Sequence, residues 1–249
     1  MKKSFYFLFL TFFAFISCSE DNDVEVQKVD VILKFTHNWD GVSVTSSDFN
    51  TFKFTTENGE AVSIEKLRYL VSNITLDTET KEYQLINIGE NSGAEIVFSD
   101  VVIGSKSLKF RFGFTDADNT DGVYQDLNSV SFNVPEMLGG GYHYMQFDGK
   151  YKDTNNADAN FNYHAIRAVD RTDPNNLIFE DTSFEVDLGS ISITKNATIE
   201  IKMDISEWFE DPNLWDLNTL NTVLMPNFEA QKMISANGKS VFSLGDVTQ

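Results

Sequence analysis

The sequence predicts a mainly β fold, an antiparallel β-sandwich or open barrel that ends in short helices. Short segments in which apolar residues occupy every second position recur along the chain, and no helical segments alternate with them. The 22 phenylalanines against only 4 prolines favour a packed β protein. Helical spacing of apolar residues appears only near the C-terminus. Together these features are typical of sandwich and barrel folds.

The first expected strand begins at Val29, from which Val31, Leu33 and Phe35 follow at every second position. A hairpin comes next, because 52–56 and 61–64 flank a turn that contains Asn58-Gly59, a pair suited to tight β-turns. The same reasoning predicts further strands at 67–76, 83–88, 107–114, 142–151, 184–188 and 197–204.

The C-terminal part carries helical patterning over 204–210 and 218–237. Asn237-Gly238 would end the second stretch as a C-cap, and Pro226 would divide it into two short helices. The chain shows no internal repeat and no linker long enough to separate domains. We therefore expect one domain, over 29–249.

The N-terminus has the pattern of a bacterial lipoprotein. A basic start, Met1-Lys2-Lys3, precedes an apolar run that is too short to span a bilayer, and Ile16-Ser17-Cys18 then resembles a lipobox. We expect residues 1–17 to be a signal peptide that is removed, Cys18 to carry the lipid, and 18–28 to include a flexible acidic tether. The acidic residues after Cys18 resemble a signal that sends lipoproteins to the cell surface in one large group of Gram-negative bacteria. This resemblance implies outer-membrane attachment with outward display, and a periplasm-facing protein is the alternative.

The composition limits the partners and the chemistry. The formal net charge is −19, and removing residues 1–17, which hold two lysines and no acid, makes it −21. Such an acidic chain is not expected to bind nucleic acid. Cys18 is the only cysteine, so its lipidation would leave no thiol for disulfides, zinc thiolates or nucleophilic catalysis.

The three histidines are the candidate metal ligands. His37 and His143 lie in expected strands, His164 follows Asn162-Tyr163, and all three have aromatic neighbours. Residues two apart in a strand share a face, so Met145 is expected beside His143. Imidazole and thioether ligands without thiolates suit copper, above all Cu(I). The alternative for each histidine is a hydrogen-bonded structural residue, and a shared site requires that the three converge.

Several segments in order resemble the methanobactin-associated copper-binding proteins, the MbnP-like family. The resemblance covers roughly Val29 to Leu244. The segments that carry it are Leu67–Leu76, Phe110–Asp116, Met137–Gly149, Asn162-Tyr-His164, Ala230–Gly238 and Val241-Phe242.

The resemblance implies copper held by histidines, with a tryptophan oxidised to kynurenine near the metal in some members. His164 matches a family histidine, and His143 lies in the matching strand. The tryptophans that usually follow the position of Met137 are replaced here by Leu138-Gly-Gly-Gly141, which argues against the kynurenine form of the site. Trp39, two residues from His37, is the only substitute that the sequence suggests.

A second cation motif lies at 116–122. Asp116, Asp118 and Asp121 alternate with other residues and close on Gly122, as in loops that hold calcium through several oxygens. The segment lacks the twelfth-position glutamate of an EF-hand, and an ordinary acidic loop is the competing interpretation.

The function that the sequence favours is an envelope-anchored lipoprotein that captures, stores or shuttles copper and is not an enzyme. No serine-hydrolase, zinc-protease or phosphate-loop motif is present. The main alternative is a surface module that binds glycans or a protein, for which Trp39, Trp208 or Trp215 should be exposed. A copper-dependent redox enzyme is a third option.

Overall fold

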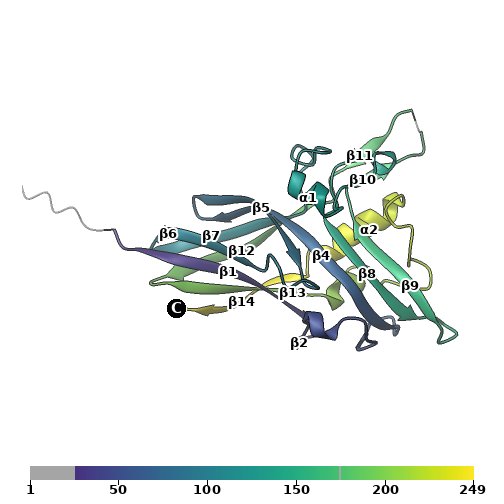
Figure 1. The fold of residues 1–249 in the computed structure, drawn as a ribbon, viewed down its shortest axis with the longest axis horizontal. Coiled ribbons are helices and arrows are strands. Elements are labelled where there is room, and N and C mark those ends of the chain that lie inside the picture. Colours follow the sequence, from purple (N-terminus) through teal and green to yellow (C-terminus); the bar gives the residue numbers. More distant parts are fainter. Residues whose placement is uncertain (1–25, 174) are drawn as a thin grey trace, which may run out of the picture.

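The structure is a computed structural model that describes residues 26–173 and 175–249. The expected signal peptide, Cys18 and most of the tether lie outside these residues. Two large β-sheets pack against each other, and short helices lie beside them (Figure 1). The predicted mainly β fold is thereby confirmed. Within the described residues, no helix is both long and apolar enough to span a membrane.

The first sheet has five strands arranged around β1. One edge of β1 pairs with β13, and β14 lies beyond β13, whereas the other edge pairs with β6 and then with β2. The β1–β13 pair is parallel, with Val31 opposite Ala197, and this is the departure from the predicted antiparallel arrangement. The strands are β1 (Lys28–Trp39), β2 (Val42–Ser43), β6 (Glu95–Val102), β13 (Ala197–Asp204) and β14 (Phe242–Thr248).

The second sheet has seven strands in the order β12-β7-β4-β8-β9, and β3 and β5 pair with the other edge of β4. A separate two-stranded sheet joins β10 to β11. The strands are β3 (Phe54–Thr55), β4 (Ala61–Leu76), β5 (Glu79–Asn87), β7 (Gly104–Phe112), β8 (Met145–Lys152), β9 (Asp158–Ala165), β10 (Ala168–Asp170), β11 (Ile178–Glu180) and β12 (Phe184–Ile193).

The long strand β4 organises the second sheet. It joins two segments that the sequence predicts as separate strands, and the same edge pairs with β8 as far as Tyr69 and with β7 from Val71. At the change of partner, the Leu70 N–H donates to Tyr144 C=O and the Leu70 C=O accepts from Gly113 N–H. Strands β7 and β8 therefore diverge at Leu70, and the chain that leads into β8 leaves the sheet ladder.

Helical structure is shorter than the sequence predicts. Of the stretch 218–237, only the second half is helical, because Pro226 precedes the helix and Asn227 caps it by accepting the Ala230 N–H. The segment 204–210 contributes a single 3₁₀ turn, and α1 was not expected. The helices are α1 (Gln125–Ser129) and α2 (Phe228–Gly238), with 3₁₀ turns at Ser46–Asp48, Glu136–Leu138 and Ser206–Phe209.

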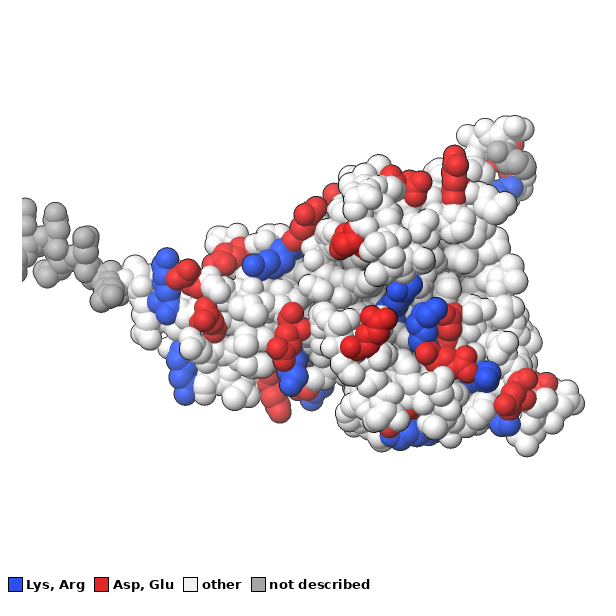
Figure 2. Space-filling model, viewed as in Figure 1, with Lys and Arg blue, Asp and Glu red and all other residues white. Residues whose placement is uncertain are grey.

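Aromatic side chains fill the space between the sheets. The Phe112 ring stacks on Phe184 at 5.0 Å between ring centres and lies 5.1 Å from Trp208. All three tryptophans are at most 3 % exposed. Outside the core, acidic side chains are spread over the face shown in Figure 2 with lysines and arginines between them, and some form ion pairs such as Lys150 with Glu65 at 3.0 Å.

Gly113 offers a test of the divergence at Leu70. Its φ is +80°, and a Cβ there would lie 2.4 Å from the Tyr144 ring, so both backbone strain and a clash oppose a side chain. We expect Gly113→Ala to lower the free energy of unfolding by about 3 kcal/mol in urea denaturation. Gly59→Ala is the control, because φ is +97° there but nothing lies within 4 Å, and its cost should be only about 1 kcal/mol. Equal effects at the two positions would contradict the packing account.

Candidate metal centre

His143 and His164 come together on the outer face of the second sheet. His164 lies in β9 directly opposite Gln146 of β8, and His143 precedes β8, where its ring comes within reach of the Gln146 amide. The centres of the two imidazole rings are 5.2 Å apart, and the rings are nearly perpendicular, at 83°. Two imidazoles that bind one ion at about 2 Å from nitrogen place their ring centres roughly 5–6 Å apart. The observed spacing fits a shared ion.

The neighbours of His143 fix its tautomer. Its Nδ1 lies 2.9 Å from the Phe132 C=O, which can only accept, and 3.3 Å from the Gln146 Nε2, which has the Ser131 C=O as another acceptor. The shorter contact assigns the proton to Nδ1 and leaves the lone pair on Nε2. That Nε2 is buried and has no hydrogen-bond partner in the described part of the chain. A buried polar atom without a partner costs about 1–3 kcal/mol, and a bound metal ion would satisfy it.

His164 is fixed in the complementary way. Its Nε2 donates to the Asp148 carboxylate at 2.7 Å, which leaves the lone pair on Nδ1. Asp148 also accepts from Asn162 at 2.7 Å and pairs with Lys66 at 3.0 Å, so the carboxylate is itself held in place. A carboxylate behind an imidazole is the usual second partner of a metal-binding histidine, because it orients the ring and raises its basicity.

Arg68 and Gln146 hold the loop that covers the pair. Arg68 Nε donates to Gln146 Oε1 at 2.7 Å, and its Nη2 donates to the carbonyls of Val130 and Ser131. The chain at 130–132 is thus tied over the sheet, which places the Phe132 carbonyl against His143. His143 is only 4 % exposed, whereas the side chains of His164 and Asp148 are 16 % and 18 % exposed, so solvent reaches the pair from the His164 side.

Burial keeps the His143 imidazole neutral. Removal from water, together with the nearby His164, lowers the pKa of His143 to about 3. Burial alone would raise the pKa of Asp148, but the hydrogen bond and charge of His164, followed by Asn162 and Lys66, hold that pKa below its ordinary value. The site therefore combines a neutral imidazole, a second imidazole and an ionised carboxylate.

The structure does not bring His37 to this pair. His37 faces the core from β1, and its Nε2 is 2.9 Å from the Tyr69 hydroxyl. Neighbouring residues of a strand point to opposite faces, so Tyr69 lies inside the sandwich while Arg68 faces the pair outside. His37 is thus on the other side of the second sheet, and the expected convergence of three histidines is not observed.

Met145 also lies away from the pair. It is fully buried opposite Tyr69 and Ala165, on the inner face of the sheet, whereas His143 reaches the outer face. The two do not share a face, contrary to the prediction, because β8 begins only at Met145 and the preceding chain, with Gly141 at φ +77°, is irregular. Trp39 stacks on Phe54 at 5.1 Å in the core, on the His37 side.

The acidic loop does not form a group of metal ligands. Asp116 lies 3.6 Å from Arg167, and Asp118 accepts from the Thr115 hydroxyl at 2.6 Å. Neither there nor elsewhere in 26–173 and 175–249 do three or more His, Cys, Asp or Glu side chains, Asp121 included, form a group that could hold an ion. The candidate centre therefore supplies two protein nitrogens, with Asp148 behind one of them.

This chain is similar to known proteins in sequence pattern and in fold. The family model described as MbnP matches residues 28–226. Among solved structures, MbnP from Methylosinus trichosporium superposes with a TM-score of 0.54 and 13 % sequence identity, over 88 % of this chain and 99 % of that one. At that identity the superposition shows a shared fold alone. Among curated proteins, none is significantly similar in sequence.

The buried histidines predict a pH dependence of the metal-free protein. Burial lowers the pKa of His37 to about 4, and that of His143 is about 3, against an ordinary value of 6.5. Below about pH 6.5 these two histidines bind protons in the unfolded chain, but in the folded protein they stay neutral until about pH 4. The free energy of unfolding should therefore fall as pH drops from about 6.5 towards 4. Imidazole ¹⁵N NMR should show both rings neutral at about pH 5. Protonation of either ring near pH 6 would contradict the burial account.

Proposed function

The chain belongs to the MbnP family, and from that premise we propose that it is a copper-binding protein anchored at the cell envelope. The observation that supports copper binding is the pair His143 and His164, in which each ring has one nitrogen fixed by a protein acceptor and a lone pair on the other. This is the state that an imidazole needs in order to bind a metal. The ion is the cargo in this proposal, and capture, storage and transfer are the roles it covers.

Copper fits the pair better than other common ions. Calcium and magnesium require several oxygen ligands, and structural zinc sites have four protein ligands, whereas the described residues offer no group of three. Imidazole suits copper, and Cu(I) tolerates low coordination numbers. The proposal for Cu(I) rests on this low coordination, because Met145 is not placed to contribute a thioether.

The partial exposure of His164 suits exchange of the ion. A ligand that approaches from the His164 side can replace water at the ion while His143, which is almost fully buried, retains its hold. Such a site needs no acid–base catalyst, and we propose binding without turnover. The glycan-binding alternative expects exposed tryptophans, but Trp39, Trp208 and Trp215 are all buried.

Metal analysis tests the ligand pair. Protein expressed with added copper should contain about one copper per chain, and His143→Ala or His164→Ala should reduce this to near zero after dialysis. His37→Ala is the matched control, because it removes a buried histidine on the other side of the sheet and should leave the copper content unchanged. Copper retained in both pair variants, or lost only in His37→Ala, would contradict the proposal.

Asp148 tests the role of the carboxylate. Asp148→Asn keeps the shape but removes the charge behind His164, and we expect copper affinity to fall by about 10–100-fold. Competition with a calibrated Cu(I) chelator measures this directly, and Asp158→Asn, on the exposed end of β9, is the control. An unchanged affinity in Asp148→Asn would remove the carboxylate from the proposed site.

The anchor is tested separately. We propose that Cys18 carries the lipid at the outer membrane, with the domain facing outwards. Cys18→Ala should move the protein from the membrane fraction to the soluble fraction, and incorporation of labelled palmitate should stop. Protease treatment of intact cells distinguishes surface display from a periplasm-facing protein. Lipid labelling that persists in Cys18→Ala would refute the anchor.

A further inference from the structure

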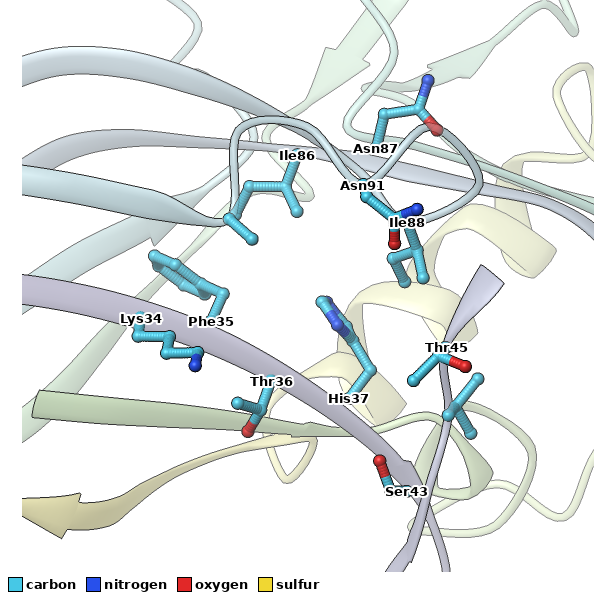
Figure 3. A pocket seen from close by; sticks show the side chains of 12 residues that line it. Lys34, Phe35, Thr36, His37, Ser43, Thr45, Ile86, Asn87, Ile88 and Asn91 are labelled. Atoms are coloured by element: carbon cyan, nitrogen blue, oxygen red, sulfur yellow. The ribbon is translucent and has the colours of Figure 1, made fainter. Parts of the chain in front are cut away.

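A pocket lies at a break in one edge of the first sheet. On this edge β1 pairs with β6 as far as Lys34 and with β2 from Asn38. Between these points the chain at 35–37 borders a cavity of about 270 Å³, closed on the far side by 86–94 (Figure 3). The cavity lies on the His37 side of the second sheet, so it is separate from the candidate metal centre.

His37 directs a hydrogen-bond donor into this pocket. His37 is 8 % exposed, and its ring is turned towards the cavity in Figure 3. His37 Nε2 lies 2.9 Å from the buried Tyr69 hydroxyl, which has no other side-chain or main-chain partner in the described chain. The phenol O–H would stay unpaired unless it donates to Nε2, so we assign the ring proton to Nδ1. No described residue bonds to that Nδ1. In this tautomer His37 Nδ1 offers the pocket an N–H donor, whereas binding of a metal would require a lone pair on that nitrogen.

The main chain adds a second donor beside the ring. The His37 C=O accepts from Val44 N–H at 2.9 Å, and the Phe35 N–H donates to Ala94 C=O at 2.8 Å. The His37 N–H points to the same edge, but no residue of the described chain accepts from it. The break in the strand pairing therefore leaves two donors of one residue, His37, at the cavity.

The rest of the lining favours an anionic head with an apolar body. Lys34, Ser43 and Asn91 contribute further donors, and the lining contains no acidic residue, although the chain has 38 acids against 19 bases. Ile86 and Ile88 form an apolar wall opposite β1. The cavity is slightly smaller than the roughly 300–1,000 Å³ of drug-sized sites, which suits a ligand of the size of benzoate.

We propose that this pocket binds a small organic monocarboxylate. One carboxylate oxygen accepts from the imidazole and main-chain N–H groups of His37, and the hydrocarbon part packs against Ile86 and Ile88. Either a free acid or the C-terminal carboxylate of a peptide carries this chemistry. The proposal does not depend on copper binding, because no residue of the His143 and His164 pair borders the pocket.

Histidine NMR tests the proposal, because the chain has only three histidines. In protein labelled with ¹⁵N-histidine, sodium benzoate and isovalerate should shift the His37 imidazole signals saturably and leave those of His143 and His164 in place. Benzamide, which has the same shape without the charge, should bind at least about tenfold more weakly. N-acetylglycylvaline in a parallel titration identifies a peptide C-terminus as the source if it binds more tightly than isovalerate.

Two variants make the result specific to the pocket. Ser43→Phe fills the cavity from an exposed position and should abolish the benzoate shift, whereas Val97→Phe, exposed on β6 outside the lining, should not change it. The proposal is overturned if benzoate and isovalerate leave His37 unaffected, if benzamide binds as well as benzoate, if Ser43→Phe still responds, or if added copper rather than the acids shifts His37.

Discussion

At Leu70 the strand β4 exchanges one partner for another, and the positions of both candidate sites follow from that exchange. The Leu70 N–H donates to the Tyr144 C=O, and the Leu70 C=O accepts from the Gly113 N–H. Strands β8 and β7 therefore pair with the same edge of β4 and diverge at this residue. The chain before β8 must then pass over the outer face of the sheet, where Arg68 ties down 130–132 and the Phe132 carbonyl meets His143. One residue earlier on β4, Tyr69 points inwards and holds His37.

The three histidines show how the acceptor or donor behind an imidazole decides what the ring can do. A carbonyl behind His143 and a carboxylate behind His164 both require an N–H, and each leaves a lone pair for a metal. The hydroxyl of Tyr69 instead donates to His37 and leaves an N–H. Because the phenol is buried and its pKa is raised well above 10, it does not lose that proton at ordinary pH. The same side chain is thus a candidate ligand at two positions and a candidate donor at the third.

Alternation of apolar residues predicted most strands, because the pattern directly reflects burial on one face. It placed β1 and β13 well. It failed in β6, where a bulge interrupts the alternation, and in β14, where only Phe242 is buried. The pairing of His143 with Met145 was wrong because the rule holds only inside a regular strand, and the strand begins at Met145. The role of Asp148 was missed because it is one acid among 38, and only the register of β8 with β9 brings it to His164.

The burial of His143 has a consequence for how the proposed copper site would respond to acid. Protons compete with a metal for the same imidazole lone pair, so a ring whose pKa is about 3 offers almost no competition near neutral pH. The cost of that burial is an Nε2 without a partner, which a bound ion removes, so binding should also stabilise the fold. His164 is more exposed and depends on an ionised Asp148 for its orientation. The pair therefore joins a buried imidazole that stays neutral well below neutral pH to a more exposed one, and exchange of the proposed ion would begin on the His164 side.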